Sequence, residues 1–275
     1  MLLSQARAVW HHSASRFRAV FSYSAVSQPD RCGTLLEVPL CGLADKSGRD
    51  IFCFDDRGRK LLSQPIGAGL KNNTLIICRP HTDSKNIFAY FSSGTNAPAA
   101  QIPYWGALLC EIRSLPKEDI ANWQELSEVF EQSKVMAFFT LDEPALTYNP
   151  FNSENKFILR IRGAFNFPQN SKNTLFVAAD DAGYFLLDNK IQIERNGRNY
   201  VYSSLRGEFR KELTFAQAPQ NFELTGINFG GNFALALGKM PNEKTVANIE
   251  AKDILPKAKI KLLAVEVKNS DMGNP

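Results

Sequence analysis

Histidine is scarce in this chain of 275 residues, which has three in all. His11 and His12 lie near the start, and His81 follows Pro80 in a predicted turn. Because histidine is the usual general base near neutral pH, this scarcity argues against nucleophilic catalysis by Ser or Cys. The sequence also lacks the GxSxG, P-loop, GxGxxG and HExxH motifs. These absences predict a protein without catalytic residues, that is, not an enzyme.

Long apolar runs and clustered charges are missing as well. No run approaches the roughly 20 apolar residues that a membrane-spanning helix needs, so the chain is predicted not to span a membrane. The net charge of +4 is spread along the sequence. Its densest basic stretches, residues 57–60 and 257–261, are short and have no interleaved aromatic residues, so they do not predict nucleic-acid binding.

The five cysteines all lie in the first 110 residues. None belongs to a CxxC motif or lies near a histidine pair, so no zinc site is predicted. In an exported protein Cys32 could pair with Cys41, or Cys53 with Cys78, and the odd number leaves at least one thiol free. The alternative is that the cysteines are buried free thiols that pack as small hydrophobic residues. The sequence leaves both open.

Aromatic residues are plentiful, with 20 Phe and 7 Tyr, a usage typical of β-sheet proteins. With 44% hydrophobic and 22% charged residues, the chain can fill two ordinary cores. Short strand-like runs broken by turn residues occupy residues 15–98 and predict an antiparallel β-sandwich. Strand patterns return over residues 135–255. We therefore predict an all-β protein with two domains joined by a linker at 99–134.

The linker contains the single predicted helix. Apolar residues recur at helical spacing through 116–133, and Pro116, Glu118 and Asp119 suit the first turn of a helix. We expect this amphipathic helix to pack across or between the domains. At the ends of the chain, residues 1–14 are expected to be a disordered start or the remnant of a secretory signal. Residues 256–275 are expected to form a terminal strand and a linker to a missing domain.

Two local patterns in the second half predict more specific structure. Apolar residues at 157, 159 and 161 alternate with basic residues at 156, 160 and 162. This alternation is typical of a strand with one face in solvent. Asp188 and Asn189 stand between two strand-like runs and predict a tight hairpin.

Two adjacent carboxylates, Asp180 and Asp181, stand between hydrophobic strand-like runs. They are too close in the chain to be the opposed acid and base of a glycosidase. Calcium takes about six to eight oxygen ligands, and neighbouring aspartates can supply several of them. In the structural alternative, Asp180 caps a turn and Asp181 faces water. The residues alone favour that alternative.

Residues 135–255 resemble the protective-antigen-type module, a β-barrel shared by bacterial toxins, glycosidases and fungal adhesins. The resemblance is carried by an aromatic residue, the aspartate pair, a hairpin and a following glycine, namely Phe176, Asp180, Asp181, Phe185, Leu187, Asp188, Asn189, Lys190 and Gly197. Asn189 replaces the usual Gly, and asparagine also accepts the positive φ of such a turn.

Lectin members of this module hold calcium with paired aspartates joined by a cis peptide, and an Asn of a second loop completes the site. The resemblance therefore implies a calcium site formed by Asp180, Asp181 and Asn228. It also implies a ligand-binding site in which Asn232, in the same glycine-rich loop, is the spare residue.

Residues 15–98 are similar to a β-sandwich domain of bacterial envelope proteins. The segments FRAVFSYS, GRDIFCFDDRGRKL, TLIICRP and NIFAYFSSGTNAP carry this resemblance. That family occurs beside lectin-like sandwiches in exported proteins and in periplasmic parts of proton-channel proteins of the biopolymer-transport type. Asp50, Asp55 and Asp56 are its most motif-like residues here, and turn capping explains them equally well.

These observations predict a non-enzymatic bacterial protein that is exported to the periplasm or cell surface. It would bind a glycan or a surface protein through the second domain, with calcium as the one cofactor implied. The alternative is a structural or sensor region in the periplasmic part of a biopolymer-transport-type envelope complex, with structural aspartates. An accessory region of a glycoside hydrolase is the third and least favoured hypothesis.

Overall fold

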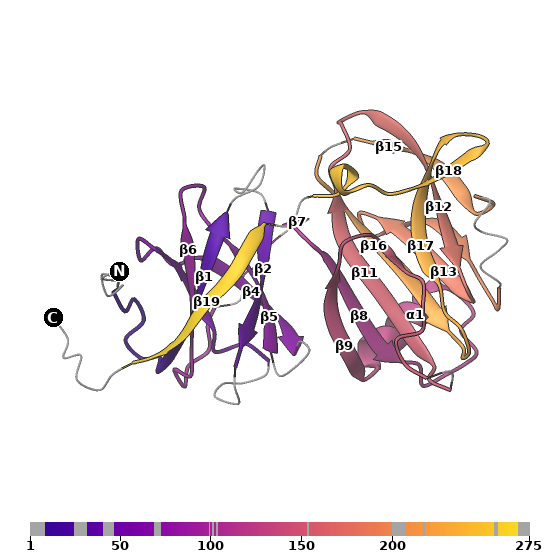
Figure 1. Ribbon diagram of the computed structural model, residues 1–275. Helices are drawn as coiled ribbons and strands as arrows, with labels where there is room; N and C mark the ends of the chain where they lie inside the picture. The colour runs from indigo at the N-terminus through magenta and orange to yellow at the C-terminus, as the bar shows by residue number, and fades with distance from the viewer. Residues whose placement is uncertain are drawn as a thin grey trace. The chain divides into compact units, whose positions relative to one another are not determined.

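The computed structural model describes residues 9–24, 32–40, 47–68, 73–98, 100, 102, 104–152, 154–199, 207–216, 218–255 and 258–268. The chain divides into two compact units, Met1–Gly106 with Lys257–Pro275 and Ala107–Pro256. Both units are built from β-sheets (Figure 1). Among the described strands, the pairing of β2 with β7 is parallel and the others are antiparallel. The predicted all-β class is confirmed.

The first unit is a sandwich of two four-stranded sheets. Its strands are β1 (Phe17–Ser24), β2 (Cys32–Pro39), β3 (Phe52–Asp55), β4 (Leu62–Ala68), β5 (Asn73–Arg79), β6 (Asn86–Phe91), β7 (Tyr104–Trp105) and β19 (Lys259–Val267). One sheet has the order β19-β1-β6-β3 and the other β4-β5-β2-β7. The core between the sheets contains Phe21, Leu36, Ile76 and Phe91.

The last described strand belongs to the first unit. β19 pairs with β1 in an antiparallel register from Phe17↔Val267 to Ser24↔Lys259. Figure 1 shows the yellow β19 beside the indigo β1. The sequence predicted a strand within residues 256–275, but it did not predict the sheet that this strand joins.

Residues 9–16 cross the outer face of the β19-β1-β6-β3 sheet, and we call them the N-terminal strap. The Trp10 ring meets Tyr90 edge-on at 5.3 Å between centroids, and the His12 ring stacks on Phe52 at 4.2 Å. The structure thus differs from the expected disordered start, because aromatic contacts hold residues 9–14. Residues 1–8 of that prediction lie outside the described residues.

The N-terminal strap is expected to weaken as the pH falls. Burial lowers the pKa of His11 below 6.5, with Arg18 adding to the effect and Asp55 opposing it, and burial with Lys60 lowers the pKa of His12. A histidine with a lowered pKa stabilises the fold above its ordinary pKa, and that contribution is lost as the pH falls through the lowered value. The melting temperature of the first unit should therefore decrease between about pH 7 and about pH 5.

The double variant His11→Gln/His12→Gln should show a smaller decrease over the same pH range. His81, an exposed histidine of the same unit, provides the matched control through His81→Gln. Equal pH dependence in the double variant and the wild type would show that the N-terminal strap does not sense pH.

The second unit also has two sheets. Its elements are β8 (Leu108–Ser114), α1 (Trp123–Gln132), β9 (Val135–Leu141), β10 (Ala145–Leu146), β11 (Phe157–Phe165), β12 (Ser171–Ala179), β13 (Ala182–Leu187), β14 (Lys190–Arg195), β15 (Arg210–Phe215), β16 (Gln220–Asn228), β17 (Leu235–Asn242), β18 (Thr245–Asn248) and the short 3₁₀ helix η2 (Ala251–Asp253). A six-stranded sheet has the order β14-β13-β16-β11-β8-β9. A five-stranded sheet has the order β10-β17-β12-β15, with β18 beside β17.

Phenylalanine rings fill the core between these two sheets. Phe165 stacks on Phe222 at 4.3 Å and meets Phe215 edge-on at 5.5 Å between centroids. Phe157 meets Phe233 at 4.9 Å. Seven of the chain's 20 Phe residues are buried in this core.

The structure differs from the predicted linker at residues 99–134. Residues Leu108–Ser114 form β8, which pairs with β11 and β9 inside the six-stranded sheet. The helix α1 is shorter than the predicted 116–133. It begins after Asn122, whose side chain accepts a hydrogen bond from the Glu125 backbone N–H at 3.0 Å. This N-cap places Pro116 well before the helix.

Helix α1 covers the outer face of the six-stranded sheet. Leu126 and Phe130 pack against Ile158 and Tyr184 of that sheet. The predicted solvent face of residues 156–162 is therefore wrong. Ile158 is fully buried and Arg160 is 7% exposed, because the helix lies over the strand. Within the described residues, no helix is both long and apolar enough to cross a membrane.

The predicted hairpin at Asp188 and Asn189 is confirmed. Leu187 pairs with Lys190 across the turn, and the two turn residues have φ values of 47° and 62°. Two consecutive positive φ angles are the geometry of a two-residue turn that matches the twist of the strands. Asparagine adopts this geometry more readily than most residues other than glycine.

Candidate functional site

Asp180 and Asp181 form the whole connection between β12 and β13, which belong to different sheets of the second unit. β12 of the five-stranded sheet ends at Ala179, and β13 of the six-stranded sheet begins at Ala182. The Asp180 backbone N–H donates to the carbonyl of Ala234 at 2.7 Å. Asp181 has a φ of 68°. This left-handed residue turns the chain from one sheet into the other.

The peptide bond between the two aspartates is trans. Among the described residues, the cis peptide is Ala218-Pro219. The site therefore departs from the lectin pattern, in which a cis peptide joins the aspartates. Here the Asp181 backbone is held by Asn199, whose carbonyl accepts the Asp181 N–H at 2.9 Å and whose Nδ2 donates to the Asp181 carbonyl at 3.2 Å.

Both carboxylates are half-buried. The Asp181 Oδ2 accepts the backbone N–H of Phe229 at 2.7 Å. Neither aspartate has an ion-pair partner among the described residues. Burial raises the pKa of Asp180, while the Asp181 N–H and Arg195 oppose the shift. Burial also raises the pKa of Asp181, and the charge of Asp180 adds to that effect, while the Phe229 N–H and the charge of Arg198 oppose it.

The structure brings Asn228 close to the aspartates but gives its side chain other partners. Asn228 is the last residue of β16 and is fully buried. Its Nδ2 donates to the carbonyl of Asn155 at 3.1 Å, and its Oδ1 accepts the Gly230 N–H at 3.2 Å. Asn232 is exposed in the same loop. The predicted roles of Asn228 in calcium binding and of both asparagines in ligand binding remain predictions.

A hard cation fits the aspartate pair better than it fits the asparagine. Two partly desolvated carboxylates that form no ion pair with any described residue supply the charged oxygens that calcium prefers. Asn228 would first have to release Gly230 before its Oδ1 could bind an ion. Within the described residues, no group of three His, Cys, Asp or Glu side chains converges. The remaining oxygens would have to come from the backbone, Asn228 or a ligand.

A shallow hollow of about 330 Å³ lies next to Phe229, the residue whose N–H donates to Asp181. Its lining residues are Glu118, Asp119, Ile120, Ala121, Gly197, Arg198 and Phe229. The Arg198 guanidinium carbon is 5.0 Å from the centre of the Phe229 ring, and its Nη2 is 3.1 Å from Glu118 Oε2. Glu118 also pairs with Lys156. Neither aspartate lines the hollow, but Phe229 does, and its N–H donates to Asp181.

We call Asp180, Asp181 and Phe229 the aspartate rim. The sequence prediction missed Phe229 and Arg198. Phe229 directly follows the predicted ligand Asn228, and Arg198 follows the motif residue Gly197. The only signal was this proximity in the chain, since neither residue type is characteristic of a site.

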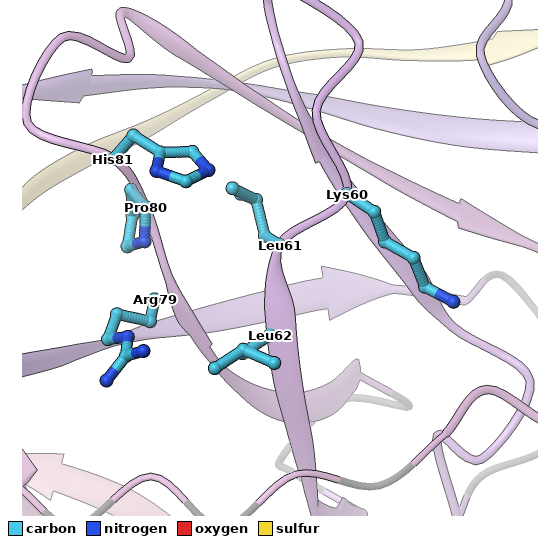
Figure 2. Close-up of a pocket in the computed structure, with 6 residues that line it drawn as sticks. All are labelled: Lys60, Leu61, Leu62, Arg79, Pro80 and His81. Atoms are coloured by element: carbon cyan, nitrogen blue, oxygen red, sulfur yellow. The ribbon is translucent and has the colours of Figure 1, made fainter.

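A second hollow, of about 220 Å³, lies in the first unit. It is lined by Lys60, Leu61, Leu62, Arg79, Pro80 and His81. Figure 2 shows the His81 ring directed toward Leu61, while the Lys60 ammonium group points away from Arg79 and His81. The basic groups do not converge on one point, so we assign no binding site here.

No family model matches the chain, and no curated protein matches it. Among solved structures, the chain is similar to the PA14 domain of the MpAFP antifreeze protein, with 9% identity over 58% of this chain and 95% of that one and a TM-score of 0.47. It is similar to the PA14 sugar-binding domain of an RTX adhesin, with 13% identity over 54% and 97% of the two chains and a TM-score of 0.44. An anti-sigma factor domain-containing protein matches with 10% identity over 88% and 80% and a TM-score of 0.41.

Likenesses this distant assign the chain to no family. Two of the three structures are PA14 domains, the protective-antigen-type module that residues 135–255 resemble. The envelope-domain resemblance of residues 15–98 stays a prediction.

Proposed function

We propose that the second unit is a binding module that holds a glycan or a cell-surface partner at the aspartate rim, with calcium as the bridging ion. The observation that carries this proposal is the pair of half-buried carboxylates on consecutive residues without an ion-pair partner in the described part of the chain. A bound dication would remove their mutual repulsion and offset their loss of hydration. The proposal includes export to the periplasm or cell surface.

The hollow next to Phe229 suits a hydroxyl-rich ligand. A calcium ion takes about six to eight oxygen ligands, so an ion held by two carboxylates keeps positions for two neighbouring sugar hydroxyls. The Phe229 ring offers an apolar surface, and Arg198 and Glu118 supply hydrogen-bond donors and acceptors around it. Binding sites commonly combine an apolar surface with a few polar groups in this way.

Binding of the whole chain to a panel of immobilised glycans, in millimolar calcium and in chelator, tests this proposal. We expect retention on at least one glycan that is lost in chelator and in Asp181→Asn. The variant Asp142→Asn should retain binding, because Asp142 is an exposed aspartate of the same unit.

Three results would contradict the proposal. Binding of nothing on the panel would remove the glycan-binding function. A partner protein retained equally well in chelator would favour the structural or sensor role in an envelope complex. Release of reducing sugar from any glycan would instead support the hydrolase hypothesis.

A further inference from the structure

Cys53 and Cys78 face each other across the core of the first unit. Cys53 lies on β3 of one sheet and Cys78 on β5 of the other, and both side chains are fully buried in the same core cluster. The strand alternation fixes this orientation. Phe52 and Phe54, the neighbours of Cys53, belong to the cluster on the outer face. The two thiols are near enough for Cys53 to raise the pKa of the Cys78 thiol, and both residues belong to the same core cluster.

Small residues flank each cysteine within its own sheet. Cys53 is opposite Ala89, which is in turn opposite Ala19. In the other sheet, Cys78 is opposite Thr34 on one side and Ser63 on the other.

A row of small side chains thus crosses each sheet at the position of its cysteine. The sheets of a sandwich pack about 10 Å apart, whereas a disulfide joins Cα atoms usually about 4.4–6.8 Å apart. Small neighbours allow the backbones to approach more closely at this point than large ones would.

We propose that Cys53 and Cys78 form a disulfide that joins the two sheets when the first unit folds in oxidising surroundings. One thiolate attacks a small-molecule disulfide such as glutathione disulfide and releases one glutathione. The second thiolate then attacks the mixed disulfide, so that the S–S bond forms and a second glutathione leaves. The two cysteines lose two electrons and two protons, and glutathione disulfide gains them.

The bond has to form before the sandwich closes. Both side chains are fully buried, and the neighbouring Cys53 thiol together with burial raises the pKa of the Cys78 thiol. A thiol needs exposure and its thiolate form to react, so the closed, reduced unit should resist oxidation and alkylation. The inference is independent of the aspartate rim, which lies in the other unit.

Of the other three cysteines, Cys110 is the one whose side chain the structure describes. Cys110 is buried in the second unit, where the described residues include no second cysteine. The alternative pair predicted from the sequence, Cys32 with Cys41, falls on Cys41 and on a Cys32 side chain that lie outside the described residues.

Refolding of the denatured and reduced whole chain in a glutathione redox buffer tests the proposal. After free thiols are alkylated, trypsin should yield residues 50–57 joined to residues 72–85, each of which contains one of the two cysteines. Cys32 and Cys41 fall together in residues 32–46, so a bond between them gives a different product. If peptides 50–57 and 72–85 are found only separately and alkylated, with no joined product, the proposal is overturned.

The disulfide should also raise the melting temperature of the first unit. It closes a loop of roughly 25 residues, for which stabilisation on the order of 10 °C is typical. Reductant should therefore lower the melting temperature of the oxidised protein, and Cys53→Ala should abolish that response. Cys110→Ala should preserve it. Equal melting temperatures for the oxidised and reduced wild type would contradict the stabilising role without the need for any variant.

Discussion

Replacing Arg160 by Met is expected to lower the free energy of unfolding of the second unit by about 3–5 kcal/mol. The Arg160 side chain is 8% exposed and lies on β11 beneath helix α1. Its guanidinium carbon is 3.6 Å from the centre of the Phe130 ring. The Nη1 atom is 2.8 Å from Glu131 Oε1, and Nε is 3.1 Å from Glu223 Oε1.

The cost arises because Glu223 would lose its main counter-ion. Burial already raises the pKa of Glu223, and Arg160 is the largest opposing influence. Without Arg160, the folded-state pKa should rise further. A raised carboxyl pKa gives stability that is present below the ordinary value of 4.5 and is lost as the pH rises through the folded value. The variant should therefore lose more free energy of unfolding, relative to the wild type, at about pH 7 than at about pH 4.5.

Urea unfolding at the two pH values measures this effect, and two variants serve as controls. Glu131→Gln should cost less than about 1 kcal/mol, because the Glu131 side chain is 60% exposed. Adding Glu223→Gln to Arg160→Met should restore much of the lost stability. A loss in Arg160→Met that is small and independent of pH would show that the ion pairs under α1 do not stabilise the unit.

Asp181→Asn is expected to abolish the stabilisation of the second unit by calcium. The asparagine side chain has the same shape, and its Oδ1 can still accept the Phe229 N–H that Asp181 accepts at 2.7 Å. The variant therefore removes a charge while keeping the local hydrogen bond. For the wild type, calcium at about 100 times its dissociation constant should add about 2.7 kcal/mol to the free energy of unfolding. The variant should gain nothing.

Calcium binding should also weaken as the pH falls. Burial raises the pKa of both aspartates, so protons compete with the ion at a higher pH than for ordinary carboxylates. Asn228→Ala should weaken binding, but it should also destabilise the unit, because Asn228 holds Asn155 and Gly230. Asp56→Ala, in the first unit, should leave calcium binding unchanged. Thermal unfolding with and without calcium, at several pH values, measures all of these effects.

Much of the local structure could be predicted from the sequence. The hairpin at Asp188 and Asn189 depends on residues that accept positive φ, and the turn geometry is local. The strand-like runs of the first half agree with β1, β2, β3, β5 and β6, because turn residues separate them, whereas β4 was not predicted. Patterns of this kind depend on interactions between neighbours in the chain.

Features that depend on distant contacts could not be predicted. Nothing in residues 259–267 identifies β1 as their partner, since strand pairing is specified by the whole fold. The alternation around Arg160 has the same pattern as a solvent-facing strand. The strand is buried instead because helix α1 covers it, and Glu223, from a distant part of the chain, neutralises the charge of Arg160.

In the candidate site, too, the features set by neighbouring residues could be predicted and those set by distant contacts could not. The aspartate pair and the glycine-rich loop are visible in the sequence as polar and flexible residues between strands. That the Phe229 N–H bonds to Asp181, and that the Asn228 side chain is already occupied, depends on how β13 and β16 pair. Arg198 and Glu118 meet only in the folded chain.

Calorimetric titration of calcium into the whole chain at neutral pH tests the central claim most directly. We predict saturable heat with one ion per chain in the wild type and in Asp142→Asn, and no saturable heat in Asp181→Asn. An absence of heat in the wild type, or equal heat in Asp181→Asn, would contradict a calcium site at the aspartate rim.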